Sequence, residues 1–300
     1  MNKTDIPHIP VMLKEVIEHL APQDNQTYID CTFGAGGYSQ KILEHTNCKL
    51  YAIDQDANVI IYANKLIEEF PGRFKFINKN FDQIPEIANE CNLEDIDGIV
   101  FDLGVSSMQL DQAERGFSFN KDARLDMRMS QNGLDAWEVV NKFSEEDLAD
   151  IIYYYGEEHF SRRIAHNIVK YRKTSSIDTT LQLAKIIQSS VKRQGKIDPA
   201  TKTFQAIRIY VNNELKVLKR ALVYSYNLLR LNGKLVIVSF QGLEDRVIKN
   251  FINNIPHANA KIHKPSAAEL KANPRARSAK LRVIIKNDSS VLPNVIEAKA

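Results

Sequence analysis

The chain has 300 residues, 44% of them hydrophobic, and a formal net charge of only +3, so it can hold one large domain or two ordinary ones with a substantial core. Residues 1–10 lack the apolar run of a signal peptide, and no stretch has the length of a membrane-spanning helix, so we expect a cytoplasmic protein without membrane contact. The three cysteines are scattered without a CxxC pair and the seven histidines lack metal-ligand spacing, which indicates reduced thiols and no metal site.

The first hundred residues alternate between strand and helix patterns. We expect strands and helices, in chain order, at 28–32, 38–44, 50–53, 57–70, 74–77 and 99–103. The last of these strands is apolar on both faces, which is typical of a buried parallel strand. This alternation predicts βαβ units and a parallel sheet, that is, an α/β fold of the Rossmann-like type.

The pattern changes after residue 110. Apolar residues at helical spacing predict three amphipathic helices, the first behind a capping box at Ser144. Their apolar positions are Leu148, Ile151, Ile152 and Tyr155, then Phe160, Ile164, Ile168 and Tyr171, then Leu183, Ile186, Ile187 and Val191. We therefore expect a helical domain at 111–203, inserted into a discontinuous α/β domain formed by 1–110 and 204–300.

The α/β pattern resumes after the insertion. One helix is expected to carry Val211, Leu215, Leu218 and Leu222 on a single face and to stop at the Asn-Gly pair 232–233. The remaining expected elements are a buried strand, a helix and a final strand, antiparallel at the end of the sheet, at 235–240, 243–253 and 281–286.

A run of glycines at 34–37 follows the first predicted strand. Glycines at a strand-to-helix turn let a ligand approach the backbone closely, which makes Gly34, Gly36 and Gly37 candidate cofactor contacts. Ser39 takes the third glycine's place in G-x-G-x-x-G, so a nicotinamide cofactor is less favoured than S-adenosylmethionine, which carries no pyrophosphate. The alternative is a tight turn without a ligand.

Acidic residues end two of the predicted strands. Asp54 follows Gly34 by twenty residues, and its carboxylate can accept hydrogen bonds from both hydroxyls of a ribose. Its alternative role is that of a helix N-cap, for which Asp56 competes. Asp102 ends the fourth strand at the same edge, where open α/β sheets bind ligands.

Several longer motifs carry a resemblance to one family. They are HIPV at 8–11, DLGVSSMQLD at 102–111, AERGFSF at 113–119, LDMRM at 125–129, TFQAIR at 203–208 and NPRARS at 273–278. Over about residues 8–286 the chain resembles the RsmH family, also called MraW, of bacterial small-subunit ribosomal RNA (cytosine-N4)-methyltransferases. The resemblance implies a Rossmann-like methyltransferase domain interrupted by a helical substrate domain, with S-adenosylmethionine as cofactor. It also implies a cytidine in the decoding region of 16S ribosomal RNA as acceptor, and it permits a homodimer.

The family's cofactor contacts map by motif onto this chain. They fall on Gly36, Gly37, Tyr38, Asp54, Phe81, Asp102 and Gln109. Phe81 could pack on the adenine, with simple core packing as the alternative. Two positions depart from the family: Tyr38, where many relatives carry His, and Gln241 in the motif SFQGLEDR. The family usually has His at the latter position, and Gln cannot titrate near neutral pH as His does.

The amine of cytosine is a poor nucleophile because its lone pair is delocalised into the ring. We hypothesise that Asp102, with Ser106 and Ser107, positions this amine, because the three follow the fourth strand beside the glycine turn. A purely cofactor-binding Asp102 is equally favoured. Phe117 and Phe119 could stack on an unpaired base, or they could anchor the inserted domain.

Basic residues form two clusters that suit a phosphate backbone, with solvated helix faces as the alternative. The helical insert carries Arg162, Arg163, Lys170, Arg172, Lys173, Lys192, Arg193 and Lys196, and the C-terminal segment carries Lys261, Lys264, Lys271, Arg275, Arg277, Lys280 and Arg282.

The sequence thus predicts an RNA amino-methyltransferase acting on 16S ribosomal RNA or the small subunit. The alternatives are a methyltransferase of another nucleic acid, a ribosome-assembly RNA-binding protein that has lost catalysis and, more distantly, a nicotinamide oxidoreductase.

Overall fold

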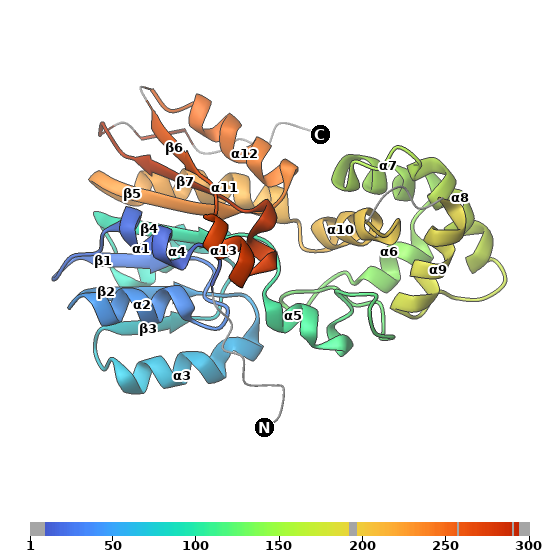
Figure 1. Cartoon of the computed structure of the whole chain (residues 1–300), viewed down its shortest axis with the longest axis horizontal. Coiled ribbons are helices and arrows are strands. Elements are labelled where there is room, and N and C mark those ends of the chain that lie inside the picture. Colours follow the sequence, from blue (N-terminus) through green and yellow to red (C-terminus); the bar gives the residue numbers. More distant parts are fainter. Residues whose placement is uncertain (1–9, 192–196, 257, 290, 294–300) are drawn as a thin grey trace. The chain divides into compact units, whose positions relative to one another are not determined.

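The computed structural model describes residues 10–191, 197–256, 258–289 and 291–293 (Figure 1). The chain forms two compact units. We call Met1–Gly104 with Leu215–Ala300 the sheet unit, and Val105–Glu214 the helical unit. None of the helices in the described ranges combines the length and the hydrophobicity needed to cross a membrane.

The sheet unit contains one seven-stranded sheet of order β3-β2-β1-β4-β5-β7-β6. The strands are β1 Thr27–Asp30, β2 Lys49–Ile53, β3 Phe74–Ile77, β4 Ile96–Asp102, β5 Leu229–Ser239, β6 Asn259–His263 and β7 Lys280–Ile285. The first five run parallel and β7 is antiparallel to both of its neighbours. The predicted Rossmann-like α/β fold is therefore confirmed. The position of the last strand is corrected, since β6 and not β7 forms the edge.

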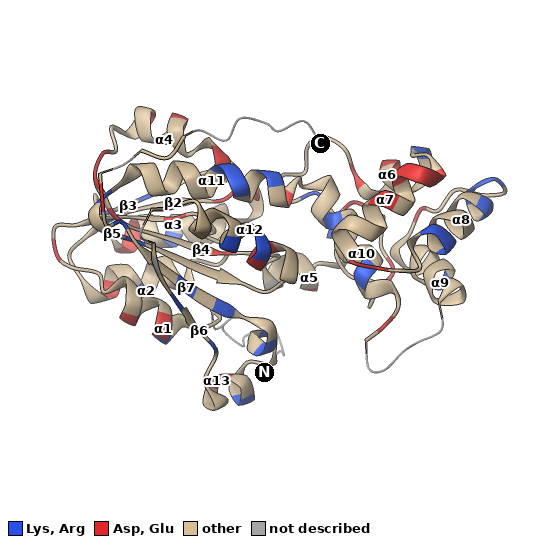
Figure 2. Cartoon of the chain, turned by 90° about the horizontal axis from the view of Figure 1, so that it is seen from above, with Lys and Arg blue, Asp and Glu red and all other residues tan. Residues whose placement is uncertain are grey.

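Helices cover both faces of this sheet (Figure 2). Those of the sheet unit are α1 Leu13–Leu20, α2 Gly37–His45, α3 Ile60–Glu69, α4 Ile84–Cys91, α11 Glu214–Leu228, α12 Gly242–Asn253 and α13 Ala267–Ala272. Ile29 and Ile99 of neighbouring strands share a buried cluster with Leu222 of α11. Gly98, one position earlier in β4, instead faces Leu20 of α1 and Tyr28 of β1. This period of two explains why strands buried on both faces are apolar throughout.

The segment after the insertion differs from the expectation in two ways. Val211 ends the helix α10, Ala200–Val211, and α11 begins only at Glu214. Asn212 breaks the helix because its side chain accepts from the Met129 N–H at 2.8 Å and donates to a distant carbonyl. The Asn-Gly pair 232–233 stops no helix, since it lies within β5, where its backbone exchanges hydrogen bonds with Lys286.

The helical unit is built from short helices around its own core. They are α5 Ser107–Asp111, α6 Ala136–Lys142, α7 Glu145–Gly156, α8 Ser161–Arg172, α9 Thr180–Ser190 and α10. The Ser144 hydroxyl caps α7 by accepting from the Asp147 N–H at 3.0 Å. The unit extends beyond the expected 111–203 at both ends. At the C-terminal end this is because Phe204 and Ile207 of α10 are buried in its core.

Candidate functional site

The glycine run forms a tight turn between β1 and α2. Gly36 has φ +83°, in the left-handed region that disfavours other residues, and it directly precedes α2. At Gly37 an added Cβ would lie 2.1 Å from Cγ of Pro10. Both positions therefore require glycine, Gly36 for its backbone conformation and Gly37 because the Pro10 ring occupies the space that a Cβ would need.

Asp54 connects this turn to the end of β2. Its Oδ2 accepts from the Gly34 N–H at 2.8 Å, and its Oδ1 accepts from the Asp56 N–H at 2.9 Å. Asp56 is the residue that caps the following turn, since its carboxylate accepts from the Asn58 N–H. Burial raises the pKa of Asp54 to about 6. A carboxylate has about four acceptor positions, so further donors can still bind Asp54.

Asp102 ends β4 with a buried oxygen atom that has no partner. Its backbone N–H donates to the Thr32 hydroxyl at 2.6 Å, whereas its Oδ1 has no hydrogen bond among the described residues. Burial raises the pKa of Asp102 well above its ordinary value, and the negative charges of Asp30 and Glu244 raise it further. A buried orphan acceptor is unfavourable unless a ligand satisfies it, so Asp102 has the chemistry expected beside a bound donor group.

Asp30 is a residue of this site that the sequence analysis did not single out. It lies fully buried at the end of β1, where its carboxylate accepts from the Ser39 hydroxyl at 2.7 Å and from the Thr32 N–H at 3.1 Å. The Thr32 hydroxyl in turn accepts a hydrogen bond from the Asp102 N–H. Asp30 therefore helps to position the end of β4 through Thr32, without contacting it. The only available signal was an acidic residue in an otherwise apolar strand.

Two predicted aromatic contacts differ in what they offer a ligand. Tyr38 is buried, and its hydroxyl donates to the Val11 carbonyl, so any cofactor contact at this position falls to the backbone. Phe81 is half-buried and packs edge-to-face on Phe101 with ring centroids 5.4 Å apart. The Phe81 ring therefore packs in the core, and the part of it that is exposed is accessible to an adenine.

The other predicted site residues belong to the helical unit. The Ser106 hydroxyl accepts from the Gln109 N–H at 3.2 Å, and Gln109 Oε1 accepts from the Ser106 N–H at 3.0 Å. This reciprocal pair caps the N-terminus of α5, which begins at Ser107. Gly34, Gly36, Gly37, Asp54 and Asp102 thus converge in the sheet unit, whereas Ser106, Ser107 and Gln109 lie in the other unit.

The two candidate base-stacking rings contribute to packing within the helical unit. Phe117 is buried in its core, with the Arg115 guanidinium 5.6 Å from the ring centroid. Phe119 packs against that core, edge-to-face with Phe204 at 4.9 Å. Both rings therefore anchor the unit.

The structure separates the basic residues into exposed and structural ones. Arg172 donates to the carbonyls of Val140 and Phe143, and Arg282 is buried against Asp245, so both are structural. Exposed positions in the two clusters are Arg162, Arg163, Lys170, Lys173, Lys261, Lys264, Lys271, Arg275 and Arg277. Several of them lie on α8 and around α13 (Figure 2). Lys192, Arg193 and Lys196 lie outside the described residues.

Gln241, the departure from the family motif, directly precedes α12. Its backbone N–H and that of Phe240 donate to the buried carboxylate of Glu244, at 3.1 and 2.9 Å. The residue therefore lies at the carboxyl end of β5, one strand away from Asp102. Across the described ranges, no group of three or more His, Cys, Asp or Glu could hold a metal ion.

The strand order with its antiparallel β7, together with acidic residues gathered at the carboxyl ends of β1, β2 and β4, defines a Rossmann-like domain of the methyltransferase type. Comparison with known proteins agrees: the model of the MraW methylase family matches residues 5–287. The chain belongs to this family.

Named relatives are similar over nearly their whole length. The ribosomal RNA small subunit methyltransferase H of Rickettsia canadensis is 52% identical, covering 92% of this chain and 96% of the relative. The protein of the same name from Ehrlichia canis is 48% identical, covering 93% and 99%. Among solved structures, an rRNA methylase from Streptococcus thermophilus aligns over 92% of this chain and 94% of that chain, at 11% identity and a TM-score of 0.41.

The burial of Asp30 predicts a specific pH dependence of stability. Burial raises its folded-state pKa to about 6, above the ordinary value of 3.8, so its ionisation destabilises the fold increasingly between about pH 4 and 6. We expect Asp30→Asn to remove this contribution. Relative to the parent, the variant should gain about 1–3 kcal/mol in free energy of unfolding between pH 4 and pH 7.5. Denaturant unfolding at both pH values measures it, with exposed Asp150→Asn as control. Parallel pH profiles for parent and Asp30→Asn would contradict it.

Proposed function

We propose that this protein transfers a methyl group from S-adenosylmethionine to the exocyclic N4 amine of a cytidine in 16S ribosomal RNA of the small subunit, in the cytoplasm. The observation that carries the proposal is the buried, unpartnered Oδ1 of Asp102, on the strand next to the glycine turn. Relatives of about half-identical sequence are named ribosomal RNA small subunit methyltransferase H, which supports the substrate class.

The glycine turn and Asp54 would hold the cofactor. The left-handed backbone of Gly34 and Gly36 permits the tight turn, and the open acceptor positions of Asp54 suit the hydroxyls of a ribose. Phe81 would pack on the adenine, and Gln109 would contact the cofactor as the family's motif implies. S-adenosylmethionine, when bound, supplies a methyl group already activated by the sulfonium. The protein's own task is then to align the acceptor.

Asp102 has the properties needed to hold and activate an amine. Its unpartnered Oδ1 can accept a hydrogen bond from the amino group, which opposes delocalisation of the nitrogen lone pair into the ring. As the N–C bond forms, the amine nitrogen gains positive charge and must lose a proton. A carboxylate whose pKa is raised by burial is a stronger base for that proton than an exposed aspartate.

Ser106 and Ser107 remain predicted partners of the amine. The Ser106 oxygen already accepts from the Gln109 N–H, and a hydroxyl that accepts one hydrogen bond can still donate its own proton. The second candidate function, RNA binding without catalysis, rests on Gln241 alone. An amide at that position retains hydrogen bonding but cannot carry a proton at neutral pH.

The direct test is identification of the modified nucleoside. The protein is incubated with labelled S-adenosylmethionine and small ribosomal subunits from a strain lacking the modification, and the digested RNA is analysed by mass. We expect N4-methylated cytidine. Cofactor binding without methyl transfer would favour the RNA-binding protein. Transfer to another nucleoside would refute the proposed acceptor.

The role of Asp102 predicts a loss of rate without a loss of cofactor. Asp102→Asn should lower kcat by about 10²–10⁴-fold, because the amine loses its base, and the Kd for S-adenosylmethionine should change little. Asp54→Asn serves as the matched variant and should weaken cofactor binding. Single-turnover kinetics and equilibrium titration separate the two effects. A rate of Asp102→Asn or Asp102→Ala near the parent's would rule out this role.

The exposed cations of α8 predict salt-dependent RNA binding. Replacing both Arg162 and Arg163 by Gln should weaken binding more at low than at high salt, lowering the slope of log K against log salt by up to about 2. The control is Lys41→Gln of α2, which removes a partly exposed cation that is paired with Glu44. Affinities for small-subunit RNA are measured by filter binding across a salt series. An unchanged slope would assign these arginines to a solvated helix face.

A further inference from the structure

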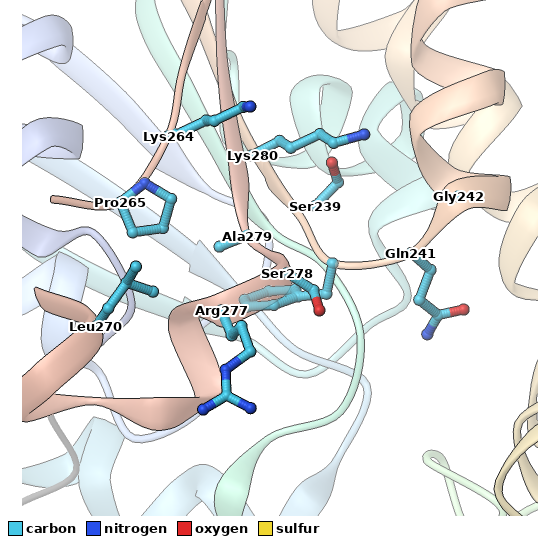
Figure 3. A pocket seen from close by; sticks show the side chains of 11 residues that line it. Ser239, Gln241, Gly242, Lys264, Pro265, Leu270, Arg277, Ser278, Ala279 and Lys280 are labelled. Atoms are coloured by element: carbon cyan, nitrogen blue, oxygen red, sulfur yellow. The ribbon is translucent and has the colours of Figure 1, made fainter. Parts of the chain in front are cut away.

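A pocket of about 460 Å³ opens at the carboxyl edge of the sheet, on the β5-β7-β6 side (Figure 3). Three strands meet there: Ser239 ends β5, Lys280 begins the antiparallel β7, and Lys264 follows β6. The pocket is lined by Ser239, Phe240, Gln241, Gly242, Lys264, Pro265, Leu270, Arg277, Ser278, Ala279 and Lys280. This mixture of apolar, cationic and hydrogen-bonding groups is typical of a site for a small ligand.

The lining carries positive charge and no acidic residue. Lys264 and Arg277 are exposed at its rim, and neither has an ion pair among the described residues. The third cation, Lys280, contacts Asp245 at 2.9 Å. Asp245 also forms ion pairs with Lys249 and with the buried Arg282. Its single negative charge therefore compensates only one of the three positive charges of Lys249, Lys280 and Arg282. The pocket is thus suited to an anion such as a phosphate.

A buried hydroxyl adds an independent sign of a ligand. Ser239 is only 1% exposed, and its Oγ has no hydrogen-bond partner in the described structure. The same residue lines the pocket, and Figure 3 shows its side chain directed toward that of Lys280. Buried polar atoms are rarely left without a partner, so a ligand that reaches this depth would satisfy it.

The pocket lies next to Asp102, on the side away from the predicted cofactor contacts. Asp102 of β4 pairs with Val238 of β5, directly before Ser239, so the pocket begins one strand away from Asp102. The glycine turn and Asp54 follow β1 and β2, on the opposite side of Asp102. The pocket therefore adjoins the side of Asp102 that faces away from the predicted cofactor contacts, where the acceptor must approach.

We propose that this pocket binds one nucleotide of the single-stranded RNA segment that contains the acceptor. Its phosphate contacts Lys264 and Arg277, a sugar or base hydrogen-bonding group reaches Ser239, and the base or ribose packs on Phe240 and Leu270. The proposal rests on the proposed function for the identity of the strand. Unlike a general attraction of RNA to basic residues, it requires a defined subset of them.

Binding of a labelled single-stranded decacytidylate, followed by fluorescence anisotropy, tests the pocket without methyl transfer. The variant Lys264→Ala/Arg277→Ala should bind about ten- to a hundredfold more weakly, since it loses two charged contacts. The matched control Lys49→Ala/Lys65→Ala removes two exposed lysines of the sheet unit that lie outside the lining and outside both basic clusters, and it should change affinity by at most about threefold. Cytidine 5′-monophosphate should compete with the probe on the parent better than cytidine or inorganic phosphate does.

Ser239→Ala tests whether the ligand forms a hydrogen bond with the buried Ser239 hydroxyl. The hydroxyl has no internal partner to lose, so thermal stability should be unchanged while the affinity for the probe falls. Parent-like affinity in the pocket variants, or an equal loss in the control, would overturn the proposal. The assay needs no methyl donor, so it is independent of methyl transfer. If the pocket binds RNA but the protein methylates no cytidine, the proposed function is refuted and the proposed nucleotide pocket is supported.

Discussion

A single carboxylate, Asp30, sets the geometry of the carboxyl edge of the sheet. It is fully buried at the end of β1 and binds both the Thr32 N–H and the Ser39 hydroxyl, on either side of the glycine turn. Thr32 then fixes the backbone of Asp102 through its own hydroxyl. The turn is held on the other side by Asp54, which accepts from the Gly34 N–H. The ends of three strands are thereby connected through hydrogen bonds, most of which have a buried carboxylate as acceptor.

This arrangement concentrates acidic groups where burial disfavours their charge. Burial raises the pKa of both Asp30 and Asp54 to about 6, and it raises that of Asp102 well above its ordinary value. The first two have several hydrogen bonds to compensate, whereas Asp102 Oδ1 has none. Such an unsatisfied, destabilised group is more often found at functional sites than in cores. The contrast between satisfied and unsatisfied carboxylates therefore supports the proposed role of Asp102 as the residue that meets the acceptor.

Much of the fold could be predicted because its strands are buried on both faces. β2 and β4 contain the apolar runs Leu50–Ile53 and Ile99–Phe101, which are a strong local signal for buried strands. β6 was missed because it is an edge strand of mixed composition, with Ile262 half exposed. The break at Asn212 was also invisible, since its cause is a pair of hydrogen bonds to Met127 and Met129, more than eighty residues away.

The same distinction applies to the candidate site. Glycines and acidic strand ends are local features, and the sequence analysis found Gly36, Asp54 and Asp102. Which basic residues are free depends on tertiary partners, so the sequence grouped the buried Arg282 with exposed lysines. The pocket likewise depends on three strands meeting at one edge. No spacing in the sequence relates Ser239 to Lys264.

The antiparallel β7 explains how one sheet can serve a donor and an acceptor at the same edge. Parallel strands bring only their carboxyl ends to that edge, and β1, β2 and β4 use theirs for the glycine turn and the acidic residues. By reversing direction, β7 brings its first residue, Lys280, to the edge beside the ends of β5 and β6. The third residue of β7, Arg282, is buried and pairs with Asp245 within the fold. Lys264 and Arg277 consequently lie on the opposite side of Asp102 from Asp30 and Asp54. This is the polarity required by a cationic methyl donor and a phosphate-bearing acceptor.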